Sequence, residues 1–135
     1  MRPHVAAVLA TTDLRLGLMR LVEVMQAGIL SPEVLAMRSL VSTEASRHPD
    51  IAALYADHSW GRNTAMLAEA LEELDRRGAL DIADHQIAAE QLTWLAVGSA
   101  LNLHELTGGT RTLGPEDLTR IATATVTTFL RAHAA

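Results

Sequence analysis

The chain has 135 residues, which is the length of one domain with one core, and its 49% hydrophobic and 20% charged residues are the balance of a globular protein. Its 11 basic residues are all arginine and dispersed, and 16 acidic residues give a net charge of -5, which excludes a basic face for nucleic acid on this chain. No cysteine is present, so disulfides and thiolate sites are excluded, and Asp13 and Arg15 interrupt the first apolar stretch too early for a signal peptide or membrane anchor. We therefore expect a cytoplasmic protein that does not associate with membranes.

The first segment, from His4 to Gln26, has apolar residues at helical spacing. Thr11-Thr12-Asp13 interrupts it with side chains that can accept the free amides of a new first turn, so either one long helix or two short ones fit. We expect Gly28 to close the segment as a left-handed residue just beyond the last turn.

The second helix has a strong start signal in Ser31-Pro32-Glu33, where serine caps, proline is preorganised and glutamate meets the positive end of the helix dipole. It is predicted to run from Pro32 to about Arg47. Its apolar residues are expected to form one face, with Arg38 among them on that side. That face consists of Val34, Leu35, Met37, Arg38, Leu40 and Val41.

The third helix begins at Pro49 and is expected to be the longest, because apolar residues recur at spacings of three and four up to Leu74. Gly61 and Asn63 lie midway, so a kink there is plausible. Gly78 is expected to end the helix.

The last two helices contain long stretches without ionisable residues, Gln91 to Leu103 and Ile121 to Leu130. Asp84 is expected to cap the first of them, Thr107 to Thr110 to stop it, and Gly114 to Asp117 to begin the second. No strand pattern occurs anywhere. The sequence predicts an all-α fold, with residues 1-135 forming a single domain of about five helices whose last two are antiparallel neighbours.

A helix without a charged face must be covered on every side, which one small domain rarely achieves. We therefore expect each of these two helices to pack inward with one face and against a second copy with the other, as a four-helix bundle in a homodimer. The alternative is a central helix within a monomer. The residues expected at the dimer interface are Leu92, Leu95, Ser99, Leu103, Ile121, Thr125, Thr128 and Phe129.

The helix order and two motifs resemble the C-terminal half of tetracycline-repressor (TetR/AcrR) type regulators. The first motif is Glu44 to Ile51 (EASRHPDI), followed by a long helix that ends in Arg77-Gly78-Ala79-Leu80. The second is Asp84 to Leu92 (DHQIAAEQL), which runs into an apolar helix. The resemblance covers roughly residues 12 to 130. The chain departs from the family pattern at His48, where many relatives carry phenylalanine.

The resemblance implies a helical domain that binds a small effector between its helices and dimerises through its last two. It also implies an N-terminal helix-turn-helix unit that reads DNA, which residues 1 to 27 do not provide. Polar or soft groups on otherwise apolar helices are the best pointers to the effector cavity. The candidates are Met37, Tyr55, His58, Trp60, Trp94, Asn102 and His104. The alternatives are that methionine and tryptophan fill the core, that histidine is exposed, and that Asn102 fixes the register of the dimer.

A catalytic or metal site finds little support. Asp81, Asp84 and His85 are better explained as a helix cap with an exposed histidine than as metal ligands, and no serine has the partners of a triad. We expect no cofactor and no enzymatic activity. The sequence favours the domain of a transcriptional regulator that senses a small, mostly apolar effector, with a naturally headless ligand binder or antagonist as the main alternative and a small helical enzyme as a distant one.

Overall fold

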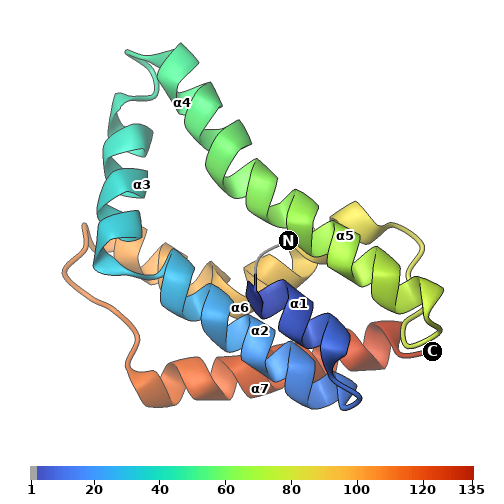
Figure 1. Ribbon diagram of the computed structural model, residues 1–135. Helices are drawn as coiled ribbons and strands as arrows, with labels where there is room; N and C mark the ends of the chain where they lie inside the picture. Colours follow the sequence, from blue (N-terminus) through green and yellow to red (C-terminus); the bar gives the residue numbers. More distant parts are fainter. Residues whose placement is uncertain (1–2) are drawn as a thin grey trace.

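The computed structural model describes residues 3–135, and side chains from residue 5 onward. All regular elements in this range are helical (Figure 1). They are α1 (Pro3–Ala10), α2 (Leu14–Ile29), α3 (Pro32–Glu44), α4 (Pro49–Tyr55), the π-helical turn η1 (Ala56–Gly61), α5 (Arg62–Arg76), α6 (His85–Leu106) and α7 (Pro115–His133). The elements α4, η1 and α5 follow without a gap, so they are the single long helix that the sequence predicted from Pro49. The all-α expectation is confirmed, with one more helix than expected because α1 and α2 are separate.

Most helix starts agree with the sequence because capping is local chemistry. The Asp13 carboxylate accepts the Leu16 amide at 3.0 Å, Ser31 accepts the Val34 amide at 3.3 Å, and Asp84 accepts the Ile87 amide at 3.0 Å. The break after α1 and the starts of α3 and α6 are thereby confirmed. Each cap therefore determines the residue at which its helix begins.

Three local predictions were wrong. Gly28 is not left-handed, since the positive φ values belong to Gly78, Gly108 and Gly109; α2 continues to Ile29 and ends with the Leu30 amide bonded back to carbonyls of its last turn. The second helix ends at Glu44, three residues before Arg47. The expected apolar face of α3 is also incorrect, because of its residues only Leu35 is buried and both Met37 and Leu40 are exposed.

The core lies where α2, α5, α6 and α7 meet, with α1 packed on α2 and α5. α6 runs back beside α5, and α7 returns antiparallel to α6 and beneath α2 (Figure 1). Leu18, Leu71 and Leu92 have no measurable exposure, and each comes from a different one of these helices. α3 and α4 contribute a single buried residue between them and stand out from the body as a corner.

One buried polar side chain ties three helices together. Gln26 of α2 is 5% exposed, and its amide nitrogen donates to the carbonyl oxygens of Ala96 in α6 and Leu118 in α7, each at 3.1 Å. A buried amide must find such partners, because an unpaired one costs free energy. Gln26 therefore fixes α2 on the pair α6 and α7.

Candidate functional site

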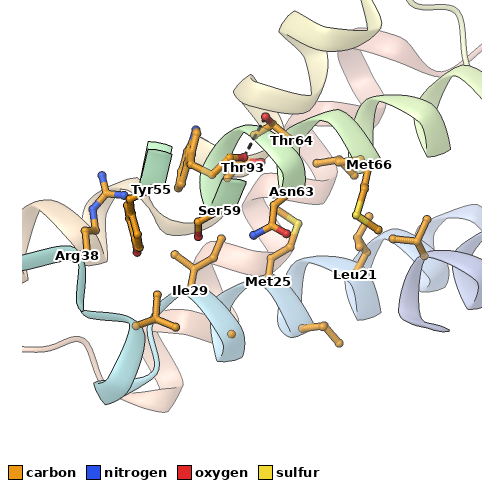
Figure 2. A pocket seen from close by; sticks show the side chains of 16 residues that line it. Leu21, Met25, Ile29, Arg38, Tyr55, Ser59, Asn63, Thr64, Met66 and Thr93 are labelled. Atoms are coloured by element: carbon orange, nitrogen blue, oxygen red, sulfur yellow. Dashed lines mark hydrogen bonds between the residues drawn. The ribbon is translucent and has the colours of Figure 1, made fainter. Parts of the chain in front are cut away.

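A partly open cavity of about 410 Å³ lies between α2 and the continuous segment α4–η1–α5 (Figure 2). α1 and α3 close its two ends through Val5 and Arg38, and Thr93 of α6 contributes to its wall. Its volume is within the range typical of small-molecule sites. Most of the wall is apolar, and it includes Leu21, Met25, Ile29, Met66 and Leu67.

The π-helical turn η1 and the first turn of α5 supply several of the polar residues of this wall. Ser59 and Trp60 lie on η1 and line the cavity, followed by Asn63 and Thr64 on the first turn of α5. Thr64 is buried, and its hydroxyl lies 3.2 Å and 3.1 Å from the carbonyl oxygens of Trp60 and Gly61, to which it can donate. π-helical turns change the direction of side chains relative to an α-helix and are frequent at functional sites. Here, Ser59 in the π-helical turn and Asn63 and Thr64 just after it face the mostly apolar cavity.

Two tryptophans and one arginine lie close together where this cavity borders a second one. The rings of Trp60 and Trp94 lie 5.2 Å apart between centroids, tilted by 44°, and the guanidinium of Arg38 lies 5.3 Å from the centroid of the Trp60 ring. The second cavity, about 680 Å³, lies against α3, α4 and the end of α6. Arg38, Tyr55 and Trp60 line both cavities, so they form the shared wall.

The structure brings together some of the ligand residues expected from sequence and separates others. Tyr55 and Trp60 line both cavities, whereas Trp94 and His104 line the second one. The remaining expected residues line neither of these cavities. They are Met37, His58 and Asn102, which are all exposed.

Neighbouring residues explain these differences. Met37 precedes Arg38, and one residue along a helix turns a side chain by about 100°, so Arg38 faces the cavities and Met37 faces away. His58 precedes Ser59 within η1 in the same way. The sequence analysis did not select Ser59, Asn63 and Thr64, which line the cavity. The signal that could have found them is that these polar residues lie on the same helical face as the leucine one turn later, Leu67.

The residues expected at a dimer interface also divide into two groups. Leu95 is 42% exposed, Ser99 and Thr128 are exposed, and Leu103 and Ile121 are partly exposed. The other expected residues are buried in the core of the protomer itself, so they offer little surface to a partner, although Phe129 also lines the groove between α6 and α7. They are Leu92 at 0%, Thr125 at 3% and Phe129 at 2% exposure.

Exposed apolar side chains also occur on α6 and α7. A groove lies between the two helices, and its lining residues are Ile87, Glu90, Gln91, Trp94 and Leu95 from α6 and Thr128, Phe129, Ala132 and His133 from α7. Ile87 is 47% and Trp94 48% exposed, and both line this groove. Large exposed apolar faces of this kind mark contact surfaces.

At the C-terminal end of α5, a cluster of polar side chains contacts the segment that connects α5 to α6. The ring of His85 lies 2.7 Å from the Asp75 carboxylate, and the Ile82 amide donates to the same oxygen at 3.3 Å. The hydrogen bond from His85 is the main cause that lowers the pKa of Asp75, against an opposing effect of burial, and the Ile82 amide adds to the lowering. Nearby, Arg77 donates to the Leu9 carbonyl oxygen at the end of α1 and to Glu73 at 2.9 Å, which ties α1 to α5.

Residues 3–135 contain neither a cluster of metal-binding side chains nor a helix long and apolar enough to cross a membrane. No group of three or more acidic, histidine or cysteine side chains lies close enough there to hold a metal ion. His85 contacts Asp75, and Asp84 caps α6, rather than both approaching Asp81. In the same part of the chain, no helix combines the length and the hydrophobicity that crossing a bilayer requires.

Comparison with known proteins concerns the fold and the family of the chain. No curated protein sequence matches the chain closely enough to count as a relative. A solved structure from Mesorhizobium loti MAFF303099, assigned to the TetR family of transcriptional regulators, superimposes with a TM-score of 0.91 at 24% identity over 98% of this chain. The chain spans 65% of the length of that protein. The sequence model for the C-terminal domain of AefR-like transcriptional repressors matches residues 17–135, and the chain therefore belongs to this family of TetR-type regulators.

Proposed function

We propose that this chain is the effector-binding and dimerisation part of a cytoplasmic TetR-type transcriptional regulator, with the 410 Å³ cavity as its effector site. The cavity is the observation on which the proposal rests. It combines an apolar wall with a few oriented polar groups, as small-molecule sites do. In the complete regulator, an N-terminal helix-turn-helix unit would bind DNA, and this chain would control that binding.

The route of control follows from which helices line the cavity. In the complete regulator, α1 would be the helix of this chain that follows the N-terminal unit. Val5 of α1 lines the cavity, and Arg77 bonds the other end of α1 to α5. An effector that contacts α2 and α5 can therefore favour one position of α1 over another. It shifts that balance only by its difference in affinity for the two positions.

Dimerisation would use the apolar face of α6 and α7. The partly or fully exposed residues Leu95, Ser99, Leu103, Ile121 and Thr128 lie on these helices, and small side chains let helices approach closely. Two copies of the pair would form a four-helix bundle. Gln26 connects this bundle to the cavity wall, because it bonds α2 to both helices.

The experiment that tests the effector site is a ligand screen by thermal stabilisation with the full chain. A ligand present at one hundred times its Kd stabilises the folded protein by about 2.7 kcal/mol. Trp60→Ala and Tyr55→Ala remove side chains of the cavity wall and are expected to weaken binding about ten-fold. His58→Ala is the matched control, because His58 belongs to the same helical segment and lines neither cavity. Equal binding by all three variants would refute this site.

A further inference from the structure

Arg38 has no anionic partner, although it lines an apolar cavity. The ion pairs of residues 5–135 involve Arg47, Arg76, Arg77 and Arg120, together with His85, and Arg38 donates no hydrogen bond within this range. Its guanidinium instead lies against the face of the Trp60 ring. This contact with the ring uses none of the five N–H donors of the guanidinium in a hydrogen bond, so they remain available to a ligand.

No acidic side chain lines this cavity within the described residues. Glu105 lines the second cavity, which Arg38 also borders, but the two side chains form no ion pair. Figure 2 shows that the polar groups are unevenly distributed. Arg38 and Tyr55 lie at one end, Ser59 and Asn63 follow in the middle, and Leu21 and Met66 lie at the other end. The cavity therefore has a cationic, hydrogen-bonding end and an apolar end.

We propose that the effector is an amphipathic monocarboxylic acid. Its carboxylate accepts hydrogen bonds from the guanidinium edge of Arg38 and from the Tyr55 hydroxyl, and its hydrocarbon tail extends between α2 and α5 toward Leu21 and Met66. The planar fork of arginine matches a carboxylate, and one cation balances one negative charge. A phosphate dianion would leave a second charge in a half-buried, mostly apolar space. This inference rests on the proposed function, because it names the ligand class of the same cavity.

The head group is tested by comparing octanoate, decanoate and dodecanoate with the alcohols of equal chain length, using tryptophan fluorescence and thermal stabilisation. In the unsubstituted chain the acid is expected to bind at least about ten-fold more tightly than its alcohol, the scale of one hydrogen bond to a charged group. Arg38→Gln is expected to remove that preference and leave alcohol binding unchanged. Arg47→Gln, whose side chain is exposed and pairs with Glu44, is the control and is expected to retain the preference.

The tail is tested by filling the far end of the cavity. Met66→Trp is expected to shift the preferred acid to a shorter chain, because the larger side chain occupies the space near Leu21. Met37→Trp is the control, since Met37 is 49% exposed and lines neither cavity, and it is expected to leave the preferred length unchanged. An unchanged optimum in Met66→Trp would overturn the proposed orientation.

The outcomes separate this inference from the proposed function. If acids and alcohols bind the unsubstituted chain equally well, the anionic ligand class is wrong and the effector cavity remains supported. If neither series binds and no other apolar ligand stabilises the chain, both fail. The comparison of acid with alcohol needs no variant, so it decides the question even if Arg38→Gln does not fold.

Discussion

Replacing Gln26 by methionine would test whether the cavity wall is anchored on the proposed dimer helices. The amide of Gln26 makes two hydrogen bonds, to Ala96 and Leu118 at 3.1 Å each, and the side chain is 5% exposed. Methionine has a similar length and no donor, so the substitution removes both bonds with little change in volume. Each bond contributes about 1 kcal/mol net. Both carbonyls lie inside helices and keep their intrahelical partners, so neither is left without a donor.

The expected loss is therefore about 2 kcal/mol, reduced to roughly 1–2 kcal/mol by the burial of an apolar side chain. For a domain of this length, that corresponds to a fall in Tm of about 4–8 °C. The assay is urea unfolding followed by circular dichroism, at one fixed protein concentration because dimerisation makes stability depend on concentration.

Gln86→Met is the control for this experiment. Gln86 is exposed, and its long hydrogen bonds to Thr64 and Glu90, 3.4 Å and 3.3 Å, are expected to contribute within about 0.5 kcal/mol. If Gln26→Met cost no more than Gln86→Met, the buried amide would not hold the three helices together. The proposed connection between the cavity and the dimer face would then lose its physical basis.

Three further predictions follow from the same packing. Leu95→Glu places a charge on the exposed face of α6 and is expected to raise the dimer dissociation constant at least ten-fold in sedimentation equilibrium. Leu40→Glu, on the exposed side of α3, is the control and is expected to leave this constant unchanged. If the dissociation constant of Leu95→Glu equals that of the unsubstituted chain, this face is not the dimer interface. Gly78→Ala is expected to cost about 1 kcal/mol in urea unfolding, because Gly78 has a φ of 82° that a Cβ disfavours; no loss would contradict this account. The folded-state pKa of Asp75 is lowered, so its contribution to stability is present above the unfolded-state pKa and is lost as the pH falls through the folded-state value. Asp75→Asn is therefore expected to lower the free energy of unfolding at neutral pH and to flatten the acid side of the curve of stability against pH. Identical curves for the two proteins would refute the role of the hydrogen bond between His85 and Asp75.

The sequence alone determined where most helices begin and end. Asp13, Ser31 and Asp84 accept amides of the turn that follows them, and Gly78 adopts the left-handed conformation that ends α5. These features involve residues a few positions apart, so they can be read without knowing the fold. Two helix ends were exceptions. Gly28 does not end α2, because a helix end can also be closed by hydrogen bonds to its last turn, as it is at Leu30, and α3 ends at Glu44, before Arg47.

The sequence also indicated that α6 and α7 lack a solvated, charged face, but it could not say which residues of each helix point inward. Leu92 and Leu95 are both leucines three positions apart, and they are 0% and 42% exposed. Which of them is buried depends on the rotation of α6 against α5 and α2, and that rotation results from packing all the core side chains at once.

The candidate site shows the same division. Tyr55 and Trp60 could be selected from sequence as polar or aromatic groups on an apolar helix, and both line the cavity. The roles of Arg38 and Asn63 depend on the tertiary structure, because η1 changes the direction of one wall and α3 brings Arg38 over the Trp60 ring. Local hydrogen bonding sets helix ends, whereas only contacts between residues far apart in the chain determine which side chains share a cavity.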